Sequence, residues 1–236
     1  MKTYIKASLD RYFSKFATKS DLDNLYLQLS SFLEVREIVG PRLPLGPLRG
    51  WALSPDALII VLQDILMRPD ARVVEFGAGE STIAIAATMR NMGSGSLVSI
   101  EQDRTFATRV TERLRQCGLL DRVDMRVVPL RKYDSCMGFS NVLSYNLRDL
   151  AFDFDIALVD GPSTDKCGVF TRAVPLNWCL EQLSEHSVIY LDDAARPGEI
   201  AIIDAIKKIR PNLGSEWLET EKGLCRLNQS VTPERP

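Results

Sequence analysis

Several features that mark other protein classes are scarce in this sequence, and their scarcity narrows what the chain can be. The 236 residues contain only 5 cysteines, which are scattered, odd in number and without a Cys-x-x-Cys pair. This distribution argues against a zinc site or a disulfide framework and favours a reducing compartment.

Long hydrophobic runs and an excess of charge of one sign are also missing. The longest apolar run, residues 57–62, is too short to cross a bilayer, and the N-terminus has no apolar signal core. The net charge is −2, so charge alone indicates no nucleic-acid partner. Hydrophobic residues make up 45% of the chain and charged residues 25%, as in ordinary globular proteins. We therefore expect a cytoplasmic protein without a transmembrane segment.

The first fifty residues differ in character from the rest. Residues 20–35 predict an amphipathic helix, and residues 40–50 are rich in proline and glycine and predict a loop. Leucines recur at helical spacing on the predicted helix: Leu22, Leu25, Leu29 and Leu33. We expect residues 1–50 to form an N-terminal helical arm and residues 51–236 the main domain. Three roles are open for the arm: a cap over the site, a helix packed on the body, or a homodimer contact.

The clearest motif is RVVEFGAGEST, residues 72–82. An apolar run leads to Glu75, and Gly77 and Gly79 follow before a segment compatible with a helix. This order predicts a buried strand, a tight turn and a helix start. The glycines allow positive φ angles and let a ligand approach the backbone closely. The new helix would direct its unpaired N–H groups toward that ligand.

The absence of a third glycine separates two kinds of ligand. A dinucleotide-binding turn has a glycine three residues after the second one, for close packing beside the pyrophosphate. Thr82 occupies that position here, so we favour a ligand without a pyrophosphate. S-adenosylmethionine (SAM) is such a ligand, and its positive charges suit Glu75 beside the turn. A plain turn without any ligand is the alternative.

A second apolar strand, residues 96–101, ends in Glu101, about one strand–helix unit after the glycine turn. At this place an acid binds ribose hydroxyls in nucleoside-binding α/β folds, because one carboxylate can accept from two vicinal hydroxyls. A solvated strand end is the alternative for Glu101. Residues 131–150 are irregular and polar, which predicts a long loop of functional character.

Two further apolar strands also end in acids. The strand within residues 152–163 delivers Asp160, and the strand within residues 187–199 delivers Asp192 and Asp193. Because the carboxyl ends of neighbouring parallel strands meet at one edge of a sheet, we expect these carboxylates to form a single cluster. Strands and helices alternate along the chain, which predicts an α/β fold with a doubly wound, mostly parallel sheet. Residues 216–228 predict a hairpin that adds an antiparallel edge strand.

The segments EFGAGEST, SIEQD, VDGPS and LDDA, in this order, resemble the class I SAM-dependent methyltransferases over about residues 51–228. LDDAARPGE is similar to a bacterial branch of small-molecule O-methyltransferases. The resemblance implies a seven-stranded, Rossmann-like methyltransferase fold with the last strand antiparallel. It also implies cofactor-binding residues: Glu75, Gly77, Ala78, Gly79, Ser81 and Thr82 at the amino-acid end of SAM, Glu101 at the ribose, Gln102, Asp103, Pro129 and Leu130 near the adenosine, and Asp160 beside them.

The acids also resemble the catechol O-methyltransferase type, in which an aspartate and an Asp-Asn pair hold magnesium. Asp160, Asp192 and Asp193 fall in those places, so the resemblance implies a site for Mg²⁺ or Mn²⁺. Asp193 departs from the pattern because the family has an amide there. Three close carboxylates repel one another, so either a divalent cation joins them or one of them holds a proton. The sequence leaves both arrangements open.

The expected reaction is methylation of a hydroxyl group on a small molecule, with a sugar or glycan precursor as one class of acceptor. Such a transfer needs aligned reactants, and a general base or a metal must activate the hydroxyl. His186 lies in the turn before the fifth strand, away from the ligand edge, which makes it a poor candidate for the base. The remaining candidates are Asp160, Asp192 and Lys166 as catalytic residues and Arg172 and Arg196 as acceptor-binding residues.

Two other functions are compatible with these motifs. One is an NAD(P)-linked oxidoreductase of Rossmann type, which Thr82 at the third glycine position disfavours. The other is a non-catalytic SAM-binding protein, which the cluster of acids disfavours.

Overall fold

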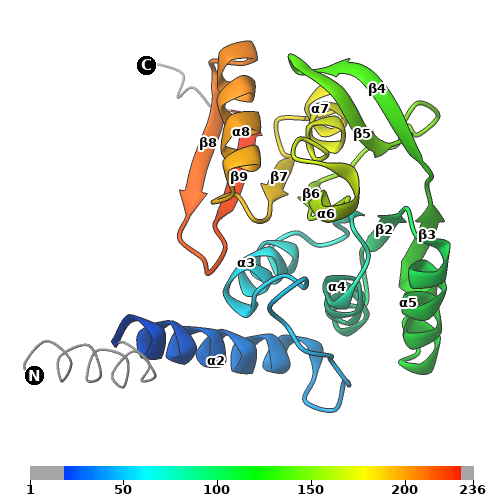
Figure 1. Ribbon diagram of the computed structural model, residues 1–236. Helices are drawn as coiled ribbons and strands as arrows, with labels where there is room; N and C mark the ends of the chain where they lie inside the picture. Colours follow the sequence, from blue (N-terminus) through cyan, green and yellow to red (C-terminus); the bar gives the residue numbers. More distant parts are fainter. Residues whose placement is uncertain (1–18, 230–236) are drawn as a thin grey trace, which may run out of the picture.

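The computed structural model describes residues 19–229; residues 1–18 and 230–236 lie outside the described range, as does the side chain of Lys166. One seven-stranded sheet, in the order β3-β2-β1-β6-β7-β9-β8, forms the centre of the molecule (Figure 1). Its strands are β1 (Arg72–Phe76), β2 (Ser96–Glu101), β3 (Val123–Val127), β6 (Ile156–Val159), β7 (Val188–Leu191), β8 (Leu213–Leu218) and β9 (Leu224–Gln229). The neighbours from β3 to β7 pair in parallel, so the predicted doubly wound fold is confirmed.

The C-terminal hairpin confirms the predicted antiparallel strand but not its place in the sheet. β9 pairs antiparallel with β7 on one side and with β8 on the other, so it lies inside the sheet rather than at its edge. The physical reason is burial: Leu224, Cys225 and Leu227 of β9 are fully covered, whereas Glu216 and Trp217 of β8 are exposed. The more polar strand of the hairpin takes the edge, where unpaired backbone groups can be solvated.

Helices cover both faces of the sheet (Figure 1). They are α2 (Lys19–Val39), α3 (Pro55–Leu66), α4 (Glu80–Met92), α5 (Arg104–Gln116), α6 (Thr164–Cys167), α7 (Ala173–Glu181) and α8 (Pro197–Ile209). A hydrophobic core lies on each face of the sheet. Successive side chains of each buried strand point into opposite cores, because side chains alternate along a strand. Val73 of β1 packs with residues of α2 to α5, whereas Val74 packs with residues of α7 and α8.

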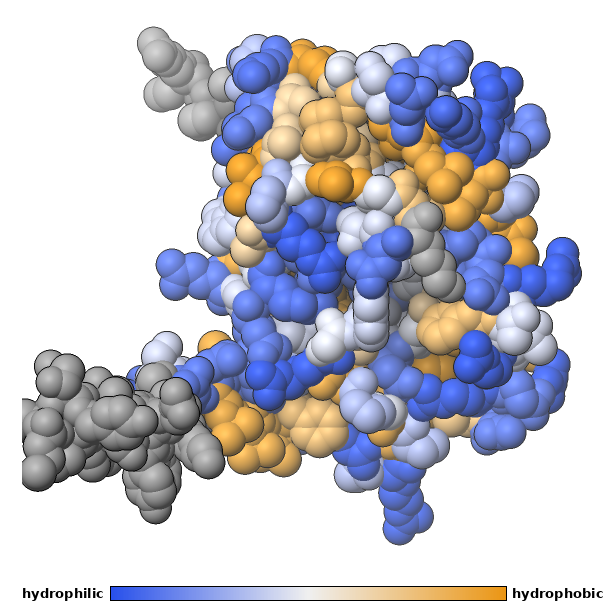
Figure 2. Space-filling model, in the orientation of Figure 1, coloured by the Kyte–Doolittle hydropathy of each residue, from blue (hydrophilic) through white to orange (hydrophobic). Residues whose placement is uncertain are grey.

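The helix predicted in the N-terminal arm is present, and the face that it packs on the body is not its apolar stripe. Gln28, Ser31, Val35 and Val39 of α2 are buried against the body. The predicted apolar stripe, which we call the leucine face, is exposed, with exposed fractions of 55%, 52%, 55% and 57%. It consists of Leu22, Leu25, Leu29 and Leu33. Figure 2 shows hydrophobic surface over α2 on this side of the molecule.

The segment that we expected to be an irregular loop, residues 131–150, is largely a two-stranded antiparallel ribbon. β4 (Leu130–Cys136) pairs with β5 (Phe139–Tyr145) outside the main sheet. The ribbon reverses at Met137 and Gly138, which both have positive φ angles, 52° and 86°. A turn of this kind matches the twist of paired strands. The loop prediction was therefore wrong, because the polar side chains lie on an exposed two-stranded ribbon and do not mark irregular structure.

Candidate active site

The turn after β1 is held together by Glu75. Its carboxylate is completely buried and accepts hydrogen bonds from the hydroxyls of Ser81, Thr82 and Ser99, the last at 2.8 Å. The Thr82 hydroxyl in turn accepts from the N–H of Gly79 at 2.8 Å. Burial raises the pKa of Glu75 against the effect of these donors. The acid before the turn therefore fastens the start of α4 to β1 and β2.

The two glycines of the turn differ in their surroundings. Gly77 has a φ of +102°, and a Cβ atom built there would lie 3.1 Å from the backbone of Asp160 and Gly161. Gly79 has a φ of 177°, which any residue adopts, and a Cβ atom there would meet nothing within 4 Å. Gly77 thus allows the turn to pack against the end of β6, while Gly79 leaves open space in front of α4.

Two adjoining cavities open at this edge of the sheet, with volumes of about 370 Å³ and 510 Å³. Both are lined by Gly77, Ala78 and Asp160, so they meet at the glycine turn. The first extends past Glu101 toward Arg196, and the second extends along the start of α4 toward the loop before α3. Such concave space at the carboxyl ends of parallel strands is where ligands bind in open α/β sheets.

The cavities contain some of the predicted cofactor-binding residues and not others. Those in the wall are Gly77, Ala78, Gly79, Ser81, Glu101, Gln102, Asp103 and Asp160. Four others line neither cavity: Glu75, Thr82, Pro129 and Leu130. For Glu75 and Thr82 the reason is the hydrogen bonding within the turn, which directs both side chains inward.

Glu101 lies at the end of β2, as predicted, and it borders the first cavity although only 4% of it is exposed. One carboxylate oxygen accepts from the N–H of Asp103 at 2.8 Å. Burial raises the pKa of Glu101, and hydrogen bonds from the backbone oppose that shift. Two buried polar atoms of the same wall, Gln102 Oε1 and Tyr145 Oη, have no hydrogen-bond partner among the described residues. Unpaired buried groups in a cavity wall are well placed to bind a polar ligand.

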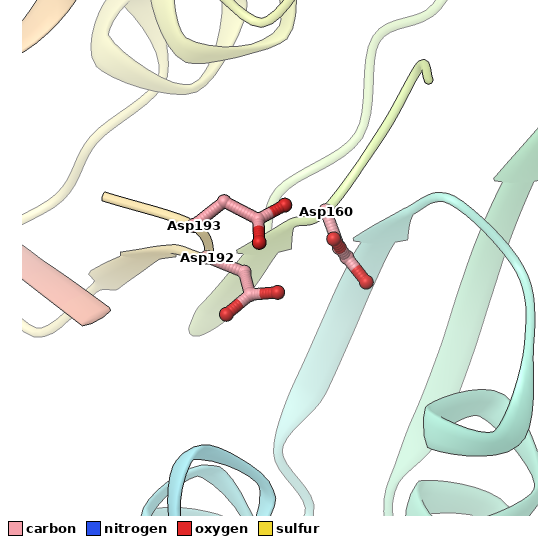
Figure 3. A group of neighbouring side chains, drawn as sticks. All are labelled: Asp160, Asp192 and Asp193. Atoms are coloured by element: carbon pink, nitrogen blue, oxygen red, sulfur yellow. The ribbon is translucent and has the colours of Figure 1, made fainter. Parts of the chain in front are cut away.

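The predicted acidic cluster is present (Figure 3), and we use this name for Asp160, Asp192 and Asp193. Asp160 follows β6 and the other two follow β7, and one oxygen of each carboxylate lies within 4.8 Å of the others. Asp193 has a φ of +53°, a left-handed conformation that aspartate tolerates better than most residues. Only Asp160 and Asp193 border the first cavity. Asp192 is completely buried and lines neither cavity, so the structure does not support its predicted catalytic role.

Arg172 lies in the middle of the acidic cluster. Its Nη2 donates to Asp160 Oδ1 at 3.1 Å and to Asp193 Oδ2 at 2.8 Å, and its Nη1 donates to the carbonyl of Asp192 at 2.7 Å. The side chain is only 3% exposed. Arg172 borders the first cavity, but its contacts favour balancing the charge of the aspartates over the acceptor-binding role that we predicted. Arg196 remains a candidate for acceptor binding, because 40% of its side chain is exposed and it borders the first cavity, where it pairs with Asp193 at 2.9 Å.

A second cation of the acidic cluster, Lys222, was not predicted. It lies in the turn between β8 and β9, and its Nζ donates to Asp192 Oδ2 at 2.9 Å and to the carbonyl of Ala52 at 3.1 Å. Burial works against its charge, but Asp192 and the other aspartates outweigh burial and raise the pKa of the ammonium. Burial and then Asp192 raise the pKa of Asp160 well above its ordinary value. The Lys222-Gly223 pair was visible in the sequence, but only as a hairpin turn.

The loop between α2 and α3 contributes to the cavities, which joins the arm to the site. Trp51 borders both cavities and is 70% exposed, opposite Phe106 and Arg109 of α5. None of these three residues belongs to a motif, so the sequence held no signal for them. Lys166, a predicted catalytic residue, lies on the short helix α6, and its side chain is outside the described part of the structure.

The order of the strands, the antiparallel β9 beside β7 and the glycine turn after β1 together define a doubly wound α/β protein of the methyltransferase type. Residues 74–194, just over half of the chain, match the model of a family described as a methyltransferase domain. The chain therefore belongs to this methyltransferase family, which confirms the resemblance noted in the sequence. None of the curated proteins compared with the chain matches it in sequence.

Solved structures with the same fold are distant in sequence. The methyltransferase PaMTH1 of Podospora anserina, solved with S-adenosylhomocysteine (SAH), is 17% identical, with a TM-score of 0.61 over 91% of this chain and 98% of its own. An O-methyltransferase of Bacillus cereus, also with SAH, is 16% identical, with a TM-score of 0.56 over 94% and 97%. TomG of Streptomyces achromogenes, an O-methyltransferase of tomaymycin synthesis solved with SAM, is 19% identical, with a TM-score of 0.51 over 94% and 96%.

No helix among residues 19–229 is long and apolar enough to cross a membrane.

Proposed function

We propose that the protein transfers a methyl group from SAM to a hydroxyl group of a small molecule. The observation that carries the proposal is the pair of adjoining cavities, with the start of α4 and the carboxylate of Glu101 on their walls and Asp160 where they meet. The ligands in the solved structures of PaMTH1, the Bacillus cereus enzyme and TomG support SAM as the methyl donor.

The proposed cofactor site uses three kinds of contact. The start of α4 borders the second cavity, and the first N–H groups of a helix have no partner within the helix, so they would bind the carboxylate of the amino-acid end. Glu101 would accept hydrogen bonds from the ribose hydroxyls, and Gln102 Oε1, which has no partner among the described residues, would accept one from the adenine amino group. The open space at Gly79 would admit the ligand close to the backbone.

When bound, SAM supplies a methyl group made electrophilic by its sulfonium. The chain must then orient the acceptor hydroxyl and remove its proton. Asp160 is our candidate base, because it borders both cavities and because burial and then the charge of Asp192 raise its pKa, as is common for catalytic acids and bases. Its carboxylate would take the hydroxyl proton as the new C–O bond forms and the C–S bond breaks.

We propose a polar acceptor, with sugars and glycan precursors as the first class to test. The wall of the first cavity beyond Asp160 carries hydrogen-bonding groups, including Ser163, Thr164, Asp165 and Arg196. Hydroxyl and charged groups in this arrangement suit a ligand with several hydroxyls, because each can form a hydrogen bond with one of them.

Calorimetry with SAM and SAH tests the cofactor. We expect wild-type protein to bind both, and Gly79→Val to abolish binding, because a Cβ atom there meets nothing within 4 Å and the added side chain would enter the cavity. Unchanged thermal unfolding of Gly79→Val is the control for folding. NADH serves as the competing ligand, and a protein that binds NADH but not SAM would be the oxidoreductase that we set aside.

Release of SAH in the presence of acceptor pools tests the reaction. Pools of sugars, nucleotide sugars and phenols would be incubated with wild-type protein and SAM. We expect turnover in a hydroxyl-bearing pool and none with Asp160→Asn. Binding of SAM without turnover in any pool would favour the non-catalytic alternative.

A further inference from the structure

We infer that Lys222 and Arg172 together take the place of a divalent cation at the acidic cluster, so that its three aspartates function without a metal. This inference rests on the proposed methyl transfer, and it chooses between the two arrangements that the sequence left open. Lys222 is a positioning residue in this scheme, because it acts on the reacting groups through Asp192 and Asp193.

The first argument is the position of the two cationic groups. The Lys222 ammonium lies 2.9 Å from Asp192 Oδ2 and 3.3 Å from Asp193 Oδ1. The Arg172 guanidinium lies 2.8 Å from Asp193 Oδ2 and 3.1 Å from Asp160 Oδ1. Every carboxylate of the acidic cluster is therefore paired with a cation of the chain itself. A metal ion would have to displace one of these groups or lie against it, and like charges at such distances repel strongly.

The second argument is the charge of the whole centre. The acidic cluster and Glu199, which lies 3.7 Å from Arg172, carry up to four negative charges. Arg172, Arg196 and Lys222 carry three positive charges. One proton on any of the four carboxylates makes the centre neutral, which is the usual state of a buried group of charges. A divalent cation would instead leave an excess of positive charge.

The third argument is that the fold builds Lys222 into its place. Gly223 has a φ of +77°, and a Cβ atom there would lie 2.8 Å from the N–H nitrogen of Ala195. The N–H groups of Ala194 and Ala195 donate to the carbonyls of Gly223 and Lys222 at 3.0 and 3.1 Å. These bonds fix the hairpin turn against the segment after β7, directly beside the acidic cluster.

The start of α3 and the loop before it secure the same turn from the other side. The N–H of Glu221 donates to Asp56 Oδ2 at 2.8 Å, and Gln28 of α2 donates to the same oxygen at 2.7 Å. Ala52, in the loop after α2, accepts a hydrogen bond from Lys222 itself. Lys222 itself contacts Asp192, Asp193 and Ala52, and its neighbour Glu221 contacts α3, so the ammonium is a fixed part of the centre.

The experiment measures binding of Mn²⁺ alone by electron paramagnetic resonance, with and without SAH. We compare wild-type protein with Lys222→Met, Lys222→Arg, Asp160→Asn and the double variant Lys222→Met with Asp160→Asn. Lys208→Met, which removes an exposed lysine of α8, is the control. We expect the wild type, Lys222→Arg and Lys208→Met to bind Mn²⁺ weakly and alike. Lys222→Met should bind it roughly tenfold tighter or more, because it leaves the buried carboxylates uncompensated. The double variant should lose that gain.

Two results would overturn the inference. One is tight binding of Mn²⁺ by the wild type that Asp160→Asn abolishes, which would make the acidic cluster a metal site. The other is a folded Lys222→Met variant that binds Mn²⁺ no better than the wild type. If Lys222→Met does not fold, as judged by circular dichroism, the wild-type and Asp160→Asn measurements decide. Because these measurements need neither SAM nor an acceptor, failure of SAM binding would refute the proposed function separately.

Discussion

The acid-bearing edge of the sheet and the arm helix α2 both bury polar groups, but they differ in whether their apolar residues are buried as well. At the sheet edge, apolar strands are buried and their terminal acids meet in a centre balanced by Arg172 and Lys222. On α2, the apolar side is exposed, whereas Gln28 is only 3% exposed and donates a hydrogen bond to Asp56. Amphipathic patterning thus reveals which side of a helix is apolar, but it does not reveal which side faces its own chain.

The difference follows from what each element packs against. The sheet is surrounded by its own helices, so hydrophobic burial decides the orientation of every strand. The arm crosses α3 at its N-terminus, where the carboxylate of Asp56 is 5% exposed and requires donors. Leaving such a group without a partner costs about 1–3 kcal/mol, which is comparable to burying one leucine. The leucine face is left uncovered by the described residues.

The largest expected effect comes from replacing a glycine that has a positive φ angle, and each of the two regions contains one. Gly77→Ala in the body should lower the free energy of unfolding by about 3 kcal/mol or more, because it adds a contact with the backbone of β6 to the unfavourable φ. Gly50→Ala in the arm loop should cost about 1 kcal/mol, because its φ is +70° but the space around it is open. Urea unfolding measures both, and equal losses would show that the close packing at Gly77 is unimportant.

The cofactor contact at the end of β2 should give the next largest effect. Glu101→Ala should weaken SAM binding by about 1–3 kcal/mol, since charge-assisted hydrogen bonds are lost in a mostly buried site. Glu112→Ala, which removes an exposed acid of α5, is the matched control and should leave affinity unchanged. Calorimetry measures both. An affinity unaffected by Glu101→Ala would move the ribose site elsewhere.

Gln28 and Leu29, neighbours on α2, test whether the buried polar residue contributes more to stability than the exposed leucine. Gln28→Leu should destabilise the fold by about 1–3 kcal/mol although it makes the helix more hydrophobic, because Asp56 loses a donor in a buried site. Leu29→Ala should change stability by no more than about 0.5 kcal/mol, because its side chain is largely exposed. Thermal unfolding of both variants is the measurement. The reverse ranking would mean that α2 packs through its leucines.

The smallest effect on stability is expected from the leucine face, where we retain the prediction of a homodimer through the arm. Leu25→Glu with Leu29→Glu should leave unfolding of the monomer nearly unchanged, because both side chains are more than half exposed. It should shift wild-type dimers to monomers, since contiguous exposed leucines are typical of contact surfaces. Sedimentation over a range of concentrations measures this, and a wild type that is monomeric throughout would refute the dimer.

Much of the site edge could be predicted because local patterns and sheet topology act together. Apolar runs that end in acids predicted where Glu101, Asp160 and Asp193 would lie, and parallel pairing guaranteed that their strand ends would share one edge. The direction in which a side chain points at such an edge could not be predicted from these patterns. Glu75 and Asp192 also end apolar strands, yet both are turned away from the cavities by donors that come from other elements.

What the sequence by itself determined was the order of the elements of the main sheet and its helices, because hydrophobic period and turn residues are local properties that each segment carries with it. Only the tertiary structure decided which groups compensate the acids, since Arg172 and Lys222 are separated from their aspartate partners by 12 to 30 residues along the chain. It also decided that α2 would bury a glutamine and expose its leucines. Hydrogen bonds of buried charges depend on three-dimensional neighbours, and no window of sequence contains them.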